Sequence, residues 1–253
     1  MKTGLEVLFT PADFVALKDR DLSGTVCVVF DILRATSTML TALGNGATAI
    51  IPVTEIAEAL AMRARQPEVL LAGERDGLRI RAAQTGSIDF DLGNSPREFM
   101  PERVSGKTIV MTTTNGTRAL QACRGARRVF PGSFLNLGAL TRRLERERPT
   151  NVLLVCSGTG DEAALEDTLA AGALCERLEK LFGGDGVSDS TVMARQLWRT
   201  ASANWPAALQ DARNGRRLLG LPDLREDVSF CAQRDTLDFV AELGHDGRVV
   251  GCG

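Results

Sequence analysis

Five polar segments of the chain each follow directly after a short apolar run. They supply carboxylates, guanidinium groups, amides and hydroxyls, which are the groups that bind metal ions and anions in proteins. Because ligands of open α/β sheets bind beyond the carboxyl ends of the strands, we expect the five segments to meet around one site. The segments are residues 31–38, 73–77, 112–117, 132–136 and 157–167.

Each segment also has an ordinary structural interpretation. Asp31 and Asn115 both precede predicted helices, and both residue types commonly cap helix N-termini. Residues 112–117 contain four threonines, an asparagine and a glycine, and they form the best anion cradle of the five segments. The convergence of five such segments favours a ligand site over five unrelated caps.

The residues that are scarce in the chain exclude several mechanisms. His245 is the single histidine and lies in a Gly-His-Asp-Gly turn, so one chain cannot build a multi-histidine metal centre. A serine triad would have to use that same turn residue, which we expect to be solvated. None of the six cysteines is followed by arginine at the spacing of a thiol phosphatase, and several lie within apolar runs. We expect buried free thiols, which are typical of a reducing cytoplasm.

Composition predicts a folded globular protein. The chain has 253 residues, of which 44% are hydrophobic and 25% charged, and it is long enough for a sizeable core. The formal net charge of -2 disfavours a general nucleic-acid binder, whose surface is usually basic. Apolar runs stay well below the roughly 18 residues that cross a membrane, so we expect no membrane partner and a cytoplasmic location.

Short apolar runs alternate with amphipathic segments as far as residue 156. This alternation predicts a three-layer α/β/α fold, in which helices cover both faces of a largely parallel or mixed sheet. The predicted strands are residues 5–9, 25–30, 47–53, 69–72, 108–112, 128–131 and 151–156, with a final pair at 239–243 and 248–250. The predicted helices are residues 11–19, 35–43, 54–65, 115–123, 137–148, 163–182, 188–203 and 206–215.

Two regions depart from this alternation. Residues 73–105 are polar and rich in turn formers, and a loop of this length is usually functional or disordered. After Cys156 the chain is mostly helical, which predicts a helix-rich C-terminal third. Because no repeat, low-complexity tract or linker divides the sequence, we expect a single α/β domain over residues 1–253.

Five longer motifs occur in one order along the chain. They are Phe-Asp-Ile-Leu-Arg-Ala-Thr-Ser-Thr (30–38), Gly-Glu-Arg-Asp-Gly (73–77), Asp-Leu-Gly-Asn-Ser-Pro-Arg-Glu-Phe (91–99), Thr-Thr-Thr-Asn-Gly-Thr (112–117) and Leu-Glu-Asp-Thr-Leu-Ala-Ala-Gly-Ala (165–173). Together they resemble the 2-phosphosulfolactate phosphatases, the ComB family, from about Leu5 to the final strand pair. The resemblance implies a Mg²⁺-dependent phosphatase that cleaves 2-phospho-3-sulfolactate to 3-sulfolactate and phosphate. In methanogens that step lies on the route to coenzyme M.

A small substrate with phosphate, sulfonate and carboxylate groups requires a hard cation and several anion-binding donors. We expect the metal ligands among Asp31, Glu74, Asp76, Glu166 and Asp167, and the anion clamps among Arg34, Arg75 and Arg97. The residues expected to act in catalysis are Asp31, Arg34, Glu74 and Asp76. Further substrate contacts are expected from Asn94, Thr112, Thr113, Thr114, Asn115, Gly116, Thr117, Ser157 and Thr159.

Several alternatives stay open at the level of sequence. Asp31 follows its strand as the nucleophile of haloacid-dehalogenase phosphatases does, although Leu33 stands where those enzymes have their general acid. Either a metal-bound water or Asp31 itself would serve as the nucleophile. The same residues also suit another small phospho-acid phosphatase, including one that forms an aspartyl phosphate, or a protein that binds organic anions without turnover. No pattern in the sequence specifies an oligomeric state.

Overall fold

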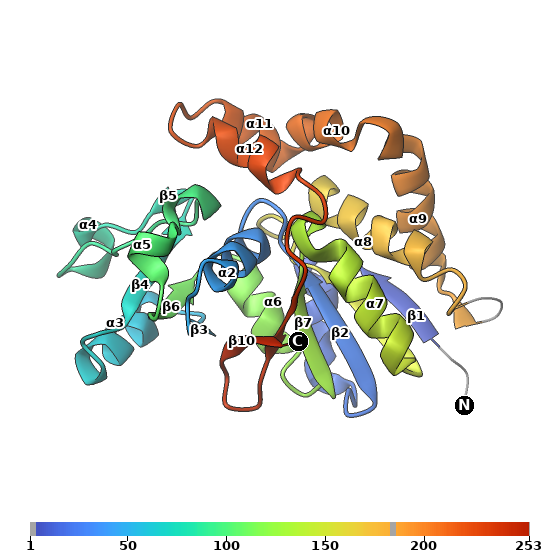
Figure 1. The fold of residues 1–253 in the computed structure, drawn as a ribbon, viewed down its shortest axis with the longest axis horizontal. Coiled ribbons are helices and arrows are strands. Elements are labelled where there is room, and N and C mark those ends of the chain that lie inside the picture. Colours follow the sequence, from blue (N-terminus) through green and yellow to red (C-terminus); the bar gives the residue numbers. More distant parts are fainter. Residues whose placement is uncertain (1–3, 183–185, 253) are drawn as a thin grey trace.

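Four parallel strands form the first sheet of the computed structural model, which describes residues 4–182 and 186–252 (Figure 1). Strand β2 shows why these segments pair. Its side chains alternate between two cores, with Val26, Val28 and Phe30 in one and Cys27 and Val29 in the other. A strand that is apolar on both faces belongs inside a sheet covered on both sides. In spatial order the strands are β1 (Gly4–Leu8), β8 (Asn151–Cys156), β2 (Thr25–Phe30) and β7 (Arg128–Gly132).

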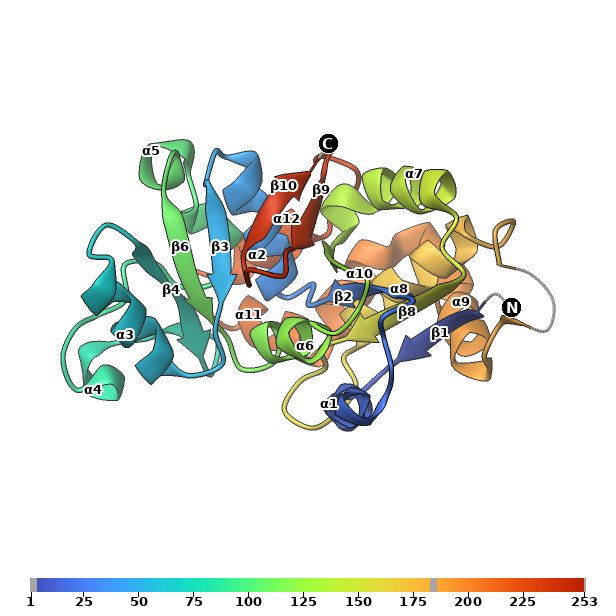
Figure 2. The same ribbon diagram turned by 90° about the horizontal axis from the view of Figure 1, so that it is seen from below.

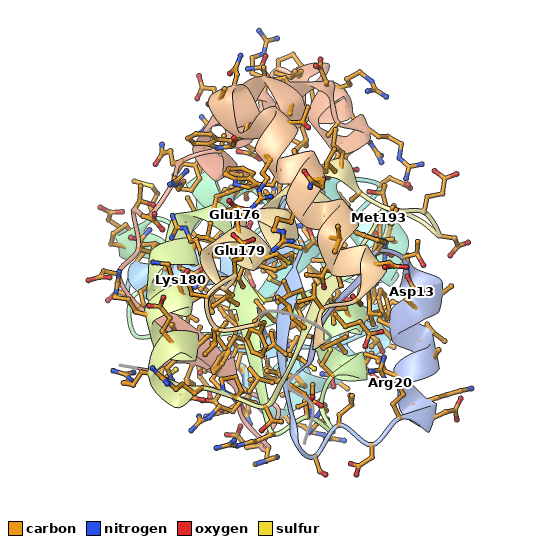
Figure 3. All side chains as sticks on the ribbon, turned by 90° about the vertical axis from the view of Figure 1, so that its right-hand side faces the viewer. Asp13, Arg20, Glu176, Glu179, Lys180 and Met193 are labelled. Carbon is orange, nitrogen blue, oxygen red and sulfur yellow. The ribbon has the colours of Figure 1, made fainter. Side chains whose placement is uncertain are left out.

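Helices cover both faces of this sheet, so the predicted three layers are present. The helices of one face are α7 (Leu137–Glu147), α8 (Leu165–Arg177) and α9 (Asp189–Ala201). The helices of the other face are α1 (Pro11–Val15), α2 (Ala35–Gly44) and α6 (Gly116–Ala122). Helix α9 lies against α8, where Glu176 and Glu179 form ion pairs with Arg199 (Figure 3).

The remaining strands form a second, mixed sheet, so the strands expected in one sheet are divided between two. Residues Leu71 and Val110 of this sheet pack with helix α3 (Ile56–Arg65), whereas Ile109 and Met111 enter a core shared with the first sheet. In spatial order its strands are β5 (Leu78–Arg79), β4 (Leu70–Arg75), β6 (Thr108–Thr112), β3 (Ala49–Pro52), β10 (Val249–Cys252) and β9 (Val240–Leu243).

The two sheets meet at β7 and β9, which contact each other. Figure 2 shows β4, β6 and β3 of the second sheet at one side of the molecule and β2, β8 and β1 of the first sheet at the other. Arg128 of β7 and Glu242 of β9 form an ion pair of 2.7 Å across this junction. Strands β3, β6 and β4 are parallel to one another, so their carboxyl ends share one edge of the second sheet. The polar segments that follow β4 and β6 therefore lie together, as do those that follow β2 and β8 in the first sheet.

The predicted helix-rich C-terminal part is confirmed, but its last helices differ from the prediction. The expected helix 206–215 is two helices, because Ala212 has an extended backbone with ψ 151. These are α10 (Trp205–Asp211) and α11 (Arg213–Leu219), followed by α12 (Arg225–Cys231), which the sequence analysis did not identify. The three helices arch over the upper ends of the strands in Figure 1.

The long polar region 73–105 is only partly a loop. It contains the end of β4, strand β5, and the helices α4 (Ala82–Thr85) and α5 (Pro101–Val104). Phe90 and Phe99 are fully buried there and anchor the region to the second sheet and its neighbouring core.

The single histidine, the cysteines and the lengths of the helices bear on three further expectations from the sequence. His245 is exposed in the turn between β9 and β10, as predicted. All six cysteines lie within the described ranges and are free thiols, five of them buried and Cys252 half-buried. In the part of the chain that the structure describes, no helix is both long and apolar enough to span a membrane.

Candidate active site

A cleft of about 400 Å³ lies where the carboxyl ends of the two sheets face the C-terminal helices. Segments far apart in the sequence line it, and side chains of both charges project into it. The polar side chains of its lining belong to Asp31, Arg34, Glu74, Asp76, Asn94, Thr114, Asn115, Thr159, Arg213, Asn214 and Arg217. Eight of the 17 predicted site residues line this cleft, and they follow strands of both sheets. Four of the five predicted polar segments contribute to the lining, whereas residues 132–136 do not.

Asp31 lies at the end of β2, on the cleft wall. Its Oδ1 accepts a hydrogen bond of 2.9 Å from the backbone N–H of Ala35, the first residue of α2. Burial raises the pKa of Asp31 to about 6, and the nearby negative charge of Glu74 adds to the rise, against the opposing hydrogen bond from Ala35. Asp31 therefore supports the start of α2 and also presents a desolvated carboxylate to the cleft.

Glu74 joins the turn after β4 to the loop after β6. Its Oε1 accepts from both the backbone N–H and the hydroxyl of Thr114, each at 2.9 Å, and its Oε2 accepts from the N–H of Gly77 at 2.6 Å. Gly77 has φ +72, a conformation that favours glycine, and this lets the turn close on the carboxylate. Glu74 consequently fixes the position of two loops that line the cleft.

Asp167 and Glu166 lie at the start of α8 beneath the cleft and are almost fully buried. Asp167 accepts hydrogen bonds from the backbone N–H groups of Ile32 and Gly158 and from the Ser157 hydroxyl, so both its oxygens are occupied. Glu166 accepts from Asn214 at 2.6 Å. Burial raises the pKa of both carboxyls, and the negative charge of Asp31 raises them further.

The five carboxylates expected to bind metal are not brought to one point. In residues 4–182 and 186–252, no three Asp, Glu, Cys or His side chains converge as a ready metal site. Asp76 lies on the rim with its side chain 92% exposed, beside Arg217. The half-buried Asp31 and the buried Glu74 are the carboxylates that line the cleft below this rim.

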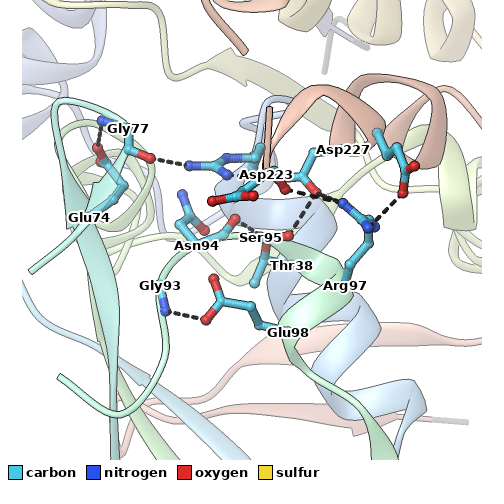
Figure 4. A network of polar contacts seen from close by, with 12 residues as sticks. Thr38, Glu74, Gly77, Gly93, Asn94, Ser95, Arg97, Glu98, Asp223 and Asp227 are labelled. Atoms are coloured by element: carbon cyan, nitrogen blue, oxygen red, sulfur yellow. Dashed lines mark hydrogen bonds and ion pairs between the residues drawn. The ribbon is translucent and has the colours of Figure 1, made fainter. Parts of the chain in front are cut away.

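Of the three arginines expected to clamp anions, Arg34 lines the cleft and the other two are engaged elsewhere. Arg34 is 3% exposed and is held by Asp227 of α12 at 2.7 Å and by the carbonyl of Gly77 at 2.6 Å. Arg75 donates to its own strand and to the hydroxyl of Thr112. Arg97 pairs with Glu226 and Asp227 on α12, next to Ser95, which also donates to Asp227 (Figure 4).

The threonine-rich segment contributes less to the cleft than predicted. The Thr112 hydroxyl donates to the carbonyl of Thr54, and Thr113 and Thr117 bond to each other at the start of α6. From this segment, Thr114 and Asn115 line the cleft. Gly116 packs so closely on Asp31 that a Cβ there would lie 2.4 Å from Asp31 Oδ2.

Two amide oxygens of the cleft are buried with no donor in reach among the described residues. They are Oδ1 of Asn94 and Oδ1 of Asn115. Buried polar atoms are nearly always satisfied, so these two oxygens indicate that the cleft holds a further polar species. Of the predicted contacts after β8, Ser157 is occupied by Asp167, whereas the Thr159 hydroxyl lines the cleft and accepts from Asn214.

Helix α11 places three further side chains in the cleft wall that were not predicted from the sequence, Arg213, Asn214 and Arg217. Their spacing matches an ordinary solvated helix face. The one available signal was the concentration of charge in Arg-Asn-Gly-Arg-Arg (213–217), next to a predicted helix end.

Comparison with known proteins places this geometry in a family. A family model described as 2-phosphosulpholactate phosphatase matches residues 14–246. A probable 2-phosphosulfolactate phosphatase of Caldanaerobacter subterraneus subsp. tengcongensis is 39% identical over 240 residues, covering 93% of this chain and 95% of that protein. Proteins with the same name from Thermotoga petrophila and Prochlorococcus marinus (strain MIT 9303) are each 40% identical, over 216 and 217 residues. These two matches cover 85% and 84% of this chain, and 88% and 86% of the relatives.

The fold, the cleft and these relatives define an α/β enzyme, a hydrolase of phosphoric monoesters. The match over most of the chain makes the assignment specific. The chain belongs to the 2-phosphosulfolactate phosphatase family.

Proposed function

We propose that this protein hydrolyses 2-phospho-3-sulfolactate to 3-sulfolactate and phosphate. The observation that carries the proposal is the pairing, in one cleft, of the desolvated Asp31 carboxylate with the buried guanidinium group of Arg34. Phosphoryl transfer requires mainly positioning and charge neutralisation, and this arrangement offers both. In the reaction, water adds to phosphorus, the bond from phosphorus to the ester oxygen breaks, and that oxygen leaves with a proton.

Mg²⁺ is part of the proposal, and the oxygen donors near Asp31 suit a hard cation. Asp31 offers a carboxylate, Asn115 an amide oxygen without a donor, and Glu74 a second carboxylate. Gly116 has no Cβ, which would otherwise lie 2.4 Å from Asp31 Oδ2 and displace it. Glu166 and Asp167 are left out of this ligand set, because they lie beneath the cleft and do not line it. When bound, Mg²⁺ would neutralise phosphate charge and lower the pKa of a coordinated water.

The residues of the chain have separate roles in this proposal. Arg34 is fixed by Asp227 and Gly77 and lines the cleft, where its remaining N–H groups would bind an anionic group of the substrate. Thr114 and Asn115 border the phosphate end, next to Asp31. Asp31 acts either as the metal ligand or as the nucleophile, and trapping of a phosphorylated Asp31 after acid quenching separates these routes.

The deciding experiment is phosphate release from 2-phosphosulfolactate and other small phospho-acids, with and without Mg²⁺. We expect turnover that an excess of chelator abolishes and added Mg²⁺ restores. Full activity in excess chelator would refute the metal requirement. Binding of the substrate without any phosphate release would instead favour the second candidate, an organic-anion-binding protein.

The proposal extends to the compartment. Six free thiols, five of them buried, are expected of a protein that works in a reducing cytoplasm. The substrate is a small anionic metabolite, and neither nucleic acid nor a membrane is part of the proposed activity.

A further inference from the structure

Helix α11 presents a cationic face to the cleft. Arg213, Asn214 and Arg217 line the cleft, whereas Arg216 of the same helix does not. The side chains of Arg213 and Arg217 remain about half exposed, at 48% and 47%. They face the same cavity as Asp31 and Glu74, which gives the cleft one wall with carboxylates and another with arginines.

The partners of these two arginines are exposed acids at the rim. Arg213 donates to the carbonyl of Thr159 at 2.9 Å and pairs with Glu162, which is 74% exposed. Arg217 donates to the carbonyl of Asp76 and lies 3.9 Å from its carboxylate, which is 92% exposed. Exposed ion pairs of this kind contribute little to stability, so a ligand anion can take the place of the acid at low cost.

The backbone of α11 is nevertheless held in place. The Asn214 side chain donates to the Thr159 hydroxyl and to the buried Glu166 carboxylate, each at 2.6 Å. Asn214 is therefore a positioning residue, which ties the helix to the end of β8 and the start of α8. The arginine stems thus start from a fixed helix, and their charged ends stay available.

The substrate of the proposed function carries three anionic groups, and the carboxylate wall does not suit all of them. The phosphate end requires Asp31 and a cation, and Arg34 already uses donors on Asp227 and Gly77. A sulfonate is fully ionised and has three acceptor oxygens, which the forked donors of arginine match. We propose that Arg213 and Arg217 bind the sulfonate of the substrate and thereby select sulfonated phosphoesters. This inference rests on the proposed phosphatase function.

The test compares two substrates that differ in the sulfonate alone, 2-phosphosulfolactate and 2-phospholactate. We expect Arg213→Gln and Arg217→Gln each to lower kcat/KM for the sulfonated substrate by about tenfold or more, mainly through KM. For 2-phospholactate, the same variants should stay within about twofold of the wild type. Arg217→Lys, which keeps the charge, should recover part of the loss.

Arg216→Gln is the matched control, because it removes the same charge from the same helix outside the cleft. It should leave both substrates unchanged, which excludes a general effect of net charge. Equal losses on both substrates in the Arg213 and Arg217 variants would assign these residues to the shared phosphate or carboxylate and overturn the proposal. Unchanged kinetics would overturn it as well. If the wild type hydrolyses neither substrate, the proposed function itself fails, which is a different result.

Discussion

Asp31 combines a helix-supporting hydrogen bond with a carboxylate that is costly to ionise, and one substitution separates the two roles. Asp31→Asn keeps an oxygen that can accept from Ala35 N–H, but it removes the negative charge and the nucleophile. We expect kcat to fall by at least about a hundredfold, equivalent to roughly 3 kcal/mol, with a melting temperature at or above that of the wild type. Normal turnover by a folded Asp31→Asn protein would leave Asp31 with its structural role alone.

The raised pKa of Asp31 also predicts a pH dependence of stability in metal-free protein. The pKa is 3.8 for the ordinary group and about 6 in the fold, so the folded state favours the protonated form. The contribution of Asp31 to the free energy of unfolding is complete below pH 3.8. This contribution is lost as the pH rises through about 6, because the desolvated Asp31 carboxyl must then ionise.

Asp31→Asn lacks this titration, so its stability relative to the wild type should increase across that pH window. A shift of about two pKa units corresponds to at most about 3 kcal/mol. Urea unfolding of both proteins in chelator, at the two ends of the window, measures the difference. A constant difference would show that Asp31 ionises without penalty.

Gly116 supplies a test by steric displacement. A Cβ at this position would lie 2.4 Å from Asp31 Oδ2 and 2.7 Å from the Ala35 Cβ, so Gly116→Ala must move the carboxylate. We expect kcat to fall by about tenfold or more, because catalysis depends on accurate positioning. Gly125→Ala is the control, since a Cβ there meets no atom within 4 Å. If both variants retain full activity, the position of Asp31 does not matter to the reaction.

Helix α12 is attached to the cleft by the buried ion pair of Arg34 and Asp227. Asp227 is 0% exposed and accepts from Arg34 and from the hydroxyl of Ser95 (Figure 4). Asp227→Ala would leave the Arg34 guanidinium buried without its counter-charge. We expect the free energy of unfolding to fall by about 3–5 kcal/mol, as measured by urea denaturation.

The neighbouring acid provides the control for this prediction. Glu226 is 67% exposed and pairs with Arg97. Glu226→Ala should therefore lower the free energy of unfolding by less than about 1 kcal/mol. Similar decreases in the free energy of unfolding of the two variants would show that the buried Arg34–Asp227 pair stabilises the fold no more than the exposed pair does. The pair also holds Arg34 at the cleft, so Asp227→Ala should raise KM as well.

The elements that the sequence did predict are those whose pattern is local. Strand β2 and the start of α2 follow from an apolar run and a polar segment, and they place Asp31 and Arg34 correctly. Helix α11 was merged into its neighbour, because a single extended residue, Ala212, separates them. Its role at the cleft depends on the long-range contacts of Asn214 with Thr159 and Glu166, which no local pattern encodes.

The distribution of thiols over the molecule predicts their reactivity. Five cysteines are buried, and burial raises the pKa of Cys175 and Cys231 to about 12, so their thiolates are scarce at neutral pH. A disulfide reagent should modify about one thiol of the native protein quickly, at Cys252, and all six after denaturation. Fast reaction of several thiols in the native state would contradict the burial described here.

The same burial predicts that the thiols take no part in catalysis. Cys27→Ala and Cys156→Ala should keep kcat within about tenfold of the wild type, with some loss of packing stability. A loss of more than about a thousandfold in a folded variant, roughly 4 kcal/mol, would reinstate a thiol mechanism.

The arrangement of the two sheets was beyond the reach of the sequence. The strand patterns predicted the strands and the three layers. The apolar runs of β2 and β6 are similar in composition, however, so the sequence does not indicate which strands pair. The division into two sheets depends on the alternation of side chains along strands such as β6. Ile109 enters the core shared with the first sheet, whereas Val110 enters the separate core beneath α3. Likewise, Arg75 and Arg97 have the right chemistry for the cleft, but tertiary contacts with Thr112 and Glu226 engage them elsewhere.

The wide spacing of the cleft residues along the chain has a consequence for how the enzyme is made. The lining extends from Asp31 to Leu218, and β2 pairs with β8, whose residues follow more than a hundred positions later. Such non-local pairings close slowly, because the entropy of a long loop is lost before the contacts form. On the ribosome, the nascent chain therefore carries Asp31 and Glu74 for most of translation without an active site. The cleft lining is complete only after α11 has been synthesised. A chain that ends before residue 213 is therefore expected to be inactive.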